Sequence, residues 1–206
     1  MSTRARGIGA LLLAFALLAF GCGENVPRLP RLGPGDVVVA FGDSLTYGTG
    51  AAEHESYPAV LGQLIGRTVV RAGVPGEVTA QSLRRLPAVL DEYQPRLVIV
   101  CLGGNDMLRK VNPAAIKRNL EVMLKELEQR RISAVLIGVP RPALLTSAAG
   151  FYGELAQDFG VPYEGEVVTS VLYSSDLKSD PIHPNARGYR KIAEALAKLL
   201  RDAGAV

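Results

Sequence analysis

The chain has no tryptophan, two histidines and two cysteines among its 206 residues. His54 and His183 are too few to build an imidazole-rich metal site, and no His/Cys/carboxylate cluster has ligand spacing, so we expect neither a metal nor a cofactor. Cys22 and Cys101 give no disulfide framework. Basic residues exceed acids by only 23 to 20 and form no stripe, which argues against a nucleic-acid partner. A composition of 48% hydrophobic and 21% charged residues is typical of one globular domain.

The amino terminus differs from the rest of the chain. Arg4 and Arg6 precede an apolar run over residues 8–20. This run is shorter than the roughly 20 residues that a membrane-spanning helix needs, but it fits the apolar core of a signal peptide. We therefore predict a signal peptide over residues 1–21, with an uncleaved anchor helix as the alternative. Its removal takes away two arginines and no acid, which lowers the formal charge from +3 to +1.

Cys22 follows directly, and the stretch 18–22 resembles the cleavage box of bacterial lipoproteins, in which the cysteine becomes the lipidated first residue. Gly23 is typical of lipoproteins that reach the outer membrane. The resemblance implies an exported, periplasmic protein that contacts the outer membrane through its lipid; Ala19 and Phe20 depart from the usual box, which leaves ordinary secretion as an alternative. Residues 22–35 are rich in proline and glycine and are expected to be a tether. Cys101, inside an apolar run, is expected to be a buried free thiol.

The body, residues 36–206, alternates apolar runs with segments of helical periodicity. Strands are expected at the start of 37–47 and at 68–70, 96–102, 134–139 and 161–163; helices at 57–65, 79–90, 113–131, 147–159 and 185–200. The connection 164–179 has no clear pattern. Apolar strands alternating with amphipathic helices predict one doubly wound α/β domain with a mostly parallel sheet covered on both faces.

Ser44 follows the apolar stretch 37–42 directly, in Gly42-Asp43-Ser44-Leu45. A buried parallel strand that stops here delivers a serine to its carboxyl end, where open α/β sheets bind their ligands. The alternative is that Ser44 caps a helix and Gly42 makes a turn.

His183 lies three residues after Asp180 in a proline-rich loop. This spacing lets the carboxylate accept the Nδ1 proton and leaves Nε2 free to take a proton from a serine. A surface loop with a capping role is the alternative. His54 lies among acids and serine and is interpreted as a solvated loop residue.

Three strand ends are expected to meet at one edge of the sheet. The backbone N–H groups of Ser44 and Gly76 and the side-chain amide of Asn105 are candidate donors to an oxyanion there. Gly76 in a plain turn and Asn105 as a helix cap are the alternatives.

The chain resembles the SGNH (GDSL-type) hydrolase family in four ordered blocks over almost the whole body. The blocks are residues 41–45, 73–79, 103–106 and 180–185. The resemblance implies a three-layer α/β/α sandwich, flavodoxin-like, with a five-stranded sheet. It also implies Ser44 as nucleophile, His183 as base and Asp180 as its orienter, with Ser44, Gly76 and Asn105 as oxyanion donors.

The chain is most similar to the thioesterase I/lysophospholipase L1 and arylesterase group. This implies hydrolysis of small-molecule aryl esters, acyl thioesters or lysophospholipids through an acyl-serine intermediate. A carbohydrate O-acetylesterase and a catalytically silent envelope-binding lipoprotein are the alternatives. Residues 47–56, 107–112 and 140–151 are expected to face the substrate. Leu144, Leu145 and Phe151 are candidates for an apolar acyl site, with an apolar helix start as the alternative. The sequence assigns no oligomeric state.

Overall fold

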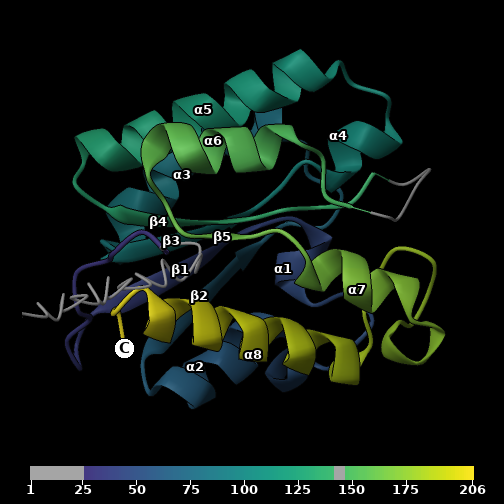
Figure 1. The fold of residues 1–206 in the computed structure, drawn as a ribbon, viewed down its shortest axis with the longest axis horizontal. Coiled ribbons are helices and arrows are strands. Elements are labelled where there is room, and N and C mark those ends of the chain that lie inside the picture. Colours follow the sequence, from purple (N-terminus) through teal and green to yellow (C-terminus); the bar gives the residue numbers. More distant parts are fainter. Residues whose placement is uncertain (1–25, 142–146) are drawn as a thin grey trace, which may run out of the picture.

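The computed structural model describes residues 26–141 and 147–206 (Figure 1). Its centre is a sheet of five parallel strands in the order β2-β1-β3-β4-β5. The strands are β1 (Val37–Gly42), β2 (Thr68–Gly73), β3 (Leu97–Cys101), β4 (Ser133–Ile137) and β5 (Tyr163–Glu164). The inner strands β1, β3 and β4 are buried along nearly their whole length, as continuous apolar runs require in a sheet covered on both sides. The predicted α/β fold is confirmed.

Helices cover both faces of the sheet, which makes three layers (Figure 1). On one face lie α3 (Thr79–Tyr93), α5 (Pro113–Gln129) and α6 (Phe151–Phe159), and on the other α2 (Tyr57–Ile65) and α8 (Ala186–Asp202). The apolar stripe of α5 recurs every three or four residues and is fully buried. It comprises Ile116, Leu120, Met123, Leu124 and Leu127.

The register of the central strands determines where the site forms. Gly42 at the end of β1 is aligned with Gly73 of β2 on one side and with Cys101 of β3 on the other. The chain leaves β1 toward β2 and then returns to β3, so the strand order reverses at β1. Ligand sites of open α/β sheets lie at such a reversal, outside the carboxyl ends of the strands.

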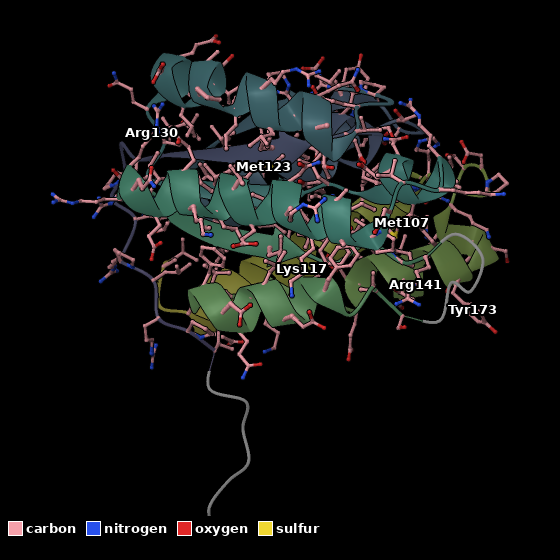
Figure 2. All side chains as sticks on the ribbon, turned by 90° about the horizontal axis from the view of Figure 1, so that it is seen from above. Met107, Lys117, Met123, Arg130, Arg141 and Tyr173 are labelled. Carbon is pink, nitrogen blue, oxygen red and sulfur yellow. The ribbon has the colours of Figure 1, made fainter. Side chains whose placement is uncertain are left out.

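Three short helices occupy this carboxyl edge: α1 (Ser44–Tyr47), α4 (Gly104–Leu108) and α7 (Val167–Tyr173). In Figure 2, Met107 of α4, Arg141 after β4 and Tyr173 of α7 lie at one end of the molecule, and Arg130 at the end of α5 lies at the other. These segments, which follow β3, β4 and β5, therefore meet at a single pole of the molecule.

The structure corrects one sequence expectation and assigns a segment for which the sequence shows no pattern. The helix expected at 147–159 begins only at Phe151, because Ala148 forms an antiparallel bridge with Pro140 before the chain turns into the helix at Gly150. The connection 164–179 contains α7 and a 3-10 turn (Ser175–Leu177). One helix of seven residues is too short for its apolar period to stand out.

The described part of the expected tether, residues 26–35, packs on the body. Leu29 donates its backbone N–H to Ala203 O at 2.9 Å, and Leu32 donates to Ala205 O at 2.8 Å. The Leu32 side chain is 3% exposed and belongs to the core. These residues meet the end of α8, at the pole opposite α1 and α7 (Figure 1). The predicted signal peptide and Cys22 lie outside the described residues. In the part of the chain that the structure describes, no helix has the length and apolar character to cross a membrane.

The packing of Leu32 predicts that Leu32→Ala lowers the free energy of unfolding by about 2–4 kcal/mol, because it removes a buried side chain and leaves a cavity. Urea denaturation of the two proteins measures this. Leu64→Ala is the matched control, since Leu64 is 39% exposed, and should change stability by less than about 1 kcal/mol. Equal, small effects of both changes would show that residues 26–35 act as a loose tether.

Candidate active site

Ser44 is the first residue of α1 and follows β1 after one residue, Asp43. The turn is so tight that Gly42 has no room for a side chain: a Cβ there would lie 2.1 Å from Thr46 Oγ1 and 2.4 Å from the Cys101 carbonyl oxygen. Glycine therefore lets the strand turn abruptly into the helix against its neighbour β3. The result places the half-buried Ser44 hydroxyl at the carboxyl edge of the sheet.

His183 and Asp180 meet this hydroxyl. His183 Nε2 lies 3.0 Å from Ser44 Oγ, and His183 Nδ1 lies 2.7 Å from Asp180 Oδ2. The other carboxylate oxygen, Oδ1, accepts the backbone N–H groups of Ile182 and His183, both at 2.9 Å. The structure thus brings the three predicted residues into one continuous hydrogen-bonded chain.

Asp180 is suited to orient the imidazole. Burial raises the pKa of this carboxyl, but the hydrogen bonds from the Ile182 N–H and from His183 outweigh it, so that the pKa lies below its ordinary value. An ionised Asp180 favours the tautomer with the proton on Nδ1. Nε2 of His183 then faces Ser44 Oγ as an acceptor.

The loop that carries His183 is fixed to the start of α8. Ser179 donates its backbone N–H to His183 O at 2.9 Å, and Asn185 donates to Leu177 O at 2.9 Å. Asn185 also caps α8 by accepting the Gly188 N–H at 3.1 Å. The base is therefore positioned by a helix end rather than by a free loop.

Ser44 and Asn105, two of the three predicted oxyanion donors, line one pocket, and Gly76 lines a separate recess. Within the described residues, the backbone N–H groups of Ser44 and Gly76 have no protein acceptor. Gly76 has φ +77°, and its carbonyl accepts from Arg109 Nη2 at 2.9 Å. Asn105 Nδ2 donates to Glu77 O at 3.1 Å and to Asp43 Oδ2 at 3.2 Å. Asn105 does not cap α4, whose N-cap is Gly103.

A small pocket of about 50 Å³ opens beside Ser44, Asn105 and His183. Apart from these residues it is lined mostly by apolar side chains, which suits an acyl group. The apolar lining comprises Leu45, Leu108, Val139, Pro140, Leu172 and Ile182.

The acyl-site residues expected from the sequence differ from this lining. Phe151 packs on the ring of Tyr152, with 4.4 Å between ring centroids, and does not line the pocket. Leu144 and Leu145 lie outside the described residues. The sequence did not indicate Leu172 as a pocket residue, because it lies on the short helix α7, whose period is too weak to recognise. It did not indicate Val139, because nothing at the end of the expected strand 134–139 shows that this side chain faces a ligand.

Three buried carboxyl groups lie at or near the pocket, and one of them, Asp43, is part of its lining. Asp106 accepts the Thr79 N–H at 2.8 Å and the Thr79 hydroxyl at 2.6 Å, while Glu77 pairs with Arg85 at 2.6 Å. Asp43 is 2% exposed, and burial, reinforced by the charges of Asp106 and Glu77, raises its pKa from 3.8 to about 7. Sequence reasoning assigned no role to Asp43.

His54 lies elsewhere, exposed in a 3-10 turn (Glu53–Glu55) beside Arg187 and Arg190 of α8. It does not line the pocket of Ser44. The structure therefore leaves His183 as the histidine at the site.

The chain is similar to several proteins of known activity. It is 31% identical over 179 residues to thioesterase 1/protease 1/lysophospholipase L1 of Escherichia coli, covering 83% of this chain and 86% of that protein. It is 29% identical to esterase TesA of Pseudomonas aeruginosa, covering 87% of this chain and 94% of that protein. It is 28% identical to an arylesterase of Vibrio mimicus, covering 79% of this chain and 87% of that protein.

Solved structures of esterases have a similar fold. The crystal structure of AlinE4, an SGNH-hydrolase family esterase, matches with a TM-score of 0.64 and 35% identity over 84% of this chain and 98% of that one. The crystal structure of TesA matches with a TM-score of 0.71 and 26% identity over 82% and 99%. The model of the GDSL-like Lipase/Acylhydrolase family matches residues 40–191, a region that contains all four sequence blocks. The chain therefore belongs to the GDSL-like lipase/acylhydrolase family, as its four blocks predicted.

Proposed function

We propose that this protein is a serine hydrolase of carboxylic esters and thioesters. The observation that carries the proposal is the continuous contact from Asp180 through His183 to Ser44, at 2.7 and 3.0 Å, beside an apolar pocket. Two findings support the proposal. The chain belongs to the GDSL-like lipase/acylhydrolase family, and its relatives are named as an esterase, a thioesterase and an arylesterase.

The reaction proceeds in two halves. Ser44 Oγ attacks the acyl carbonyl carbon while His183 Nε2 takes the hydroxyl proton, and the bond to the leaving oxygen or sulfur breaks as His183 returns that proton to it. Water then attacks the acyl-serine with His183 again as base, which releases the acid and restores Ser44. Asp180 stabilises the imidazolium in both halves.

Negative charge on the carbonyl oxygen needs donors that are already in place. The Ser44 and Gly76 N–H groups, which have no acceptor within the described residues, and the Asn105 amide fill this role in the proposal. Their protein environment is partly buried, which strengthens each hydrogen bond relative to water.

The apolar pocket supports an acyl chain as the recognised group, in substrates such as aryl esters, acyl thioesters or lysophospholipids. A profile of kcat/KM on p-nitrophenyl esters from acetyl to dodecanoyl, with acetylated sugars beside them, tests this. A preference for chains longer than acetyl supports the proposal, and turnover confined to acetylated sugars supports a carbohydrate O-acetylesterase.

Ser44→Ala and His183→Ala should each remove nearly all turnover, and the double variant should be little slower than either, because residues that act as one unit are not additive. Asp180→Ala should cost less, since the base remains. Initial rates on a p-nitrophenyl ester measure this, with His54→Ala as the matched control that stays within a few-fold of wild type. Loss of turnover in a folded His54→Ala protein would refute the assignment of the base.

Asn105→Ala should lower kcat by about 10²–10³-fold with a smaller change in KM, the effect expected when one oxyanion donor is removed. Steady-state kinetics separate the two constants. An unchanged kcat would remove Asn105 from the donor set.

We also propose that the protein is exported and held at the outer membrane by a lipid on Cys22. The support is the sequence pattern: an apolar segment of signal-peptide length, followed at once by a cysteine and a glycine.

Cys22→Ala should move the full-length protein from the membrane fraction to the soluble periplasmic fraction, because the attachment site for the lipid is gone. Cys101→Ala serves as the control, since Cys101 is a buried thiol in β3, and it should fractionate as the wild type does. Unchanged membrane association of the Cys22→Ala protein would exclude this anchor.

A further inference from the structure

A second recess is lined by one of the proposed oxyanion donors, Gly76. It has a volume of about 220 Å³ and is formed by the turn after β2, the start of α3 and the end of α4. Its lining comprises Val74, Pro75, Gly76, Glu77, Gln81 and Arg109. The reaction proposed above gives this recess no role, because the acyl chain occupies the pocket of Ser44.

Two features join this recess to the pocket of Ser44. Asn105 lines the pocket and donates from Nδ2 to the carbonyl oxygen of Glu77, which lines the recess, at 3.1 Å. Leu108 lines the pocket, and the next residue, Arg109, lines the recess. These residues form a common wall between the two spaces. A substrate whose reacting carbonyl lies beside Ser44 can therefore extend its leaving group toward the recess.

The recess carries a positive charge. Arg109 is exposed, and its Nη2 donates to Gly76 O at 2.9 Å. Within the described residues, Arg109 forms no ion pair with a carboxylate. The carboxylate of Glu77 does not neutralise it, because this group pairs with Arg85 and accepts from Ser82. A guanidinium has five N–H donors, so most of those on Arg109 are available to an anion.

Two neighbours of Arg109 add to this character. Gln81 lines the same recess; its Oε1 accepts the Val78 N–H at 3.1 Å, and its NH₂ group has no acceptor within the described residues. Lys110, also exposed, follows Arg109 directly. A planar guanidinium matches the oxygens of a phosphate group, with which it forms short, charge-assisted hydrogen bonds. The recess therefore has the chemistry of a phosphate site.

We propose that this recess binds a phosphate group on the leaving side of the substrate, with Arg109 as its main ligand. This inference rests on the proposed hydrolase function. Gly76 offers its N–H to the oxyanion and its carbonyl to Arg109, so the guanidinium lies within one residue of the reacting group. A short linker between ester and phosphate, as in a glycerophosphate, fits this spacing. Coenzyme A offers the same phosphate chemistry at the end of a longer arm.

Matched pairs of substrates test the site. Decanoyl glycerophosphate is compared with decanoyl glycerol, and decanoyl coenzyme A with decanoyl N-acetylcysteamine, all below their critical micelle concentrations. The preference for phosphate is the ratio of the two kcat/KM values in a pair. Arg109→Ala should lower this ratio by about 5- to 30-fold, because charge-assisted hydrogen bonds to the phosphate are lost.

The two pairs distinguish the sources of the phosphate. A fall confined to the glycerol pair assigns the site to a lipid headgroup, and a fall confined to the thioester pair assigns it to coenzyme A. A ratio that stays within twofold of wild type in both pairs would overturn the inference.

The ratio separates phosphate binding from the contact of Arg109 with Gly76. Loss of that contact would misplace an oxyanion donor, which slows both members of a pair and cancels in the ratio. Arg109→Gln retains an N–H donor for Gly76 O but removes the charge, so it should lower the ratio as alanine does. It replaces Arg109→Ala if that variant does not fold, as judged by circular dichroism.

Arg190→Ala is the matched control. Arg190 is an exposed arginine near the start of α8, and it lines a different recess together with His54. The change removes the same charge without touching the proposed site. A general attraction of the protein for anions would make both variants lower the ratio. An equal fall in Arg190→Ala would therefore refute a local site at Arg109.

Binding provides a readout that does not depend on turnover. Ser44→Ala lacks the nucleophile, so its affinity for decanoyl glycerophosphate and for decanoyl coenzyme A can be measured by calorimetry. Adding Arg109→Ala should weaken the affinity for the ligand that the ratios identify by about 5- to 30-fold. Absence of turnover on every ester by the wild-type protein would overturn the hydrolase function itself. Turnover with unchanged ratios and affinities in the Arg109 variants would overturn only the phosphate site.

Discussion

The alignment of three strand ends is the constraint on which the site depends. Gly42, Gly73 and Cys101 lie in register across β1, β2 and β3. The loops that follow these three strands therefore begin at the same level of the sheet. They carry Ser44, the turn at Gly76 and Asn105. Both glycines are needed for close contact, since a Cβ at Gly73 would lie 2.2 Å from Tyr47 N. A side chain at either position would push α1 away from its neighbours and with it the nucleophile.

The base comes from a distant part of the chain and reaches the same edge by another route. The loop before α8 closes on itself through the bridge between Lys178 and Pro184, and Tyr189 of α8 donates its hydroxyl to Thr49 O at 2.8 Å. This last contact joins α8 to the loop that follows Ser44. The hydrogen bond between Tyr189 and Thr49 therefore links the segment of the nucleophile to the segment of the base. Such a link suits two groups, Ser44 Oγ and His183 Nε2, that lie 3.0 Å apart and must keep this distance for catalysis.

Much of this arrangement could be predicted from the sequence, for identifiable reasons. Long apolar runs and long amphipathic helices such as α5 have a strong period, and parallel strands bring their carboxyl ends to one edge, so Ser44, Gly76 and Asn105 could be named together. The spacing between Asp180 and His183 separately indicated the base. The acyl pocket could not be predicted, because Leu172 lies on a seven-residue helix and the expected Phe151 turns toward Tyr152. The contact of Asp43 with Asn105 depends on side-chain directions in two tight turns, which no periodicity encodes.

The packing of residues 26–35 on the end of α8 has a consequence for the direction from which substrates arrive. α8 runs from the catalytic pole to the opposite one over 17 residues, a length of about 25 Å. From Cys22 to Val26 a fully extended chain spans at most about 14 Å. A lipid on Cys22, as proposed, would therefore hold the body with its catalytic pole turned away from the bilayer that anchors it. The enzyme would then meet its esters from the aqueous space in front of that membrane, and not by lateral diffusion within it.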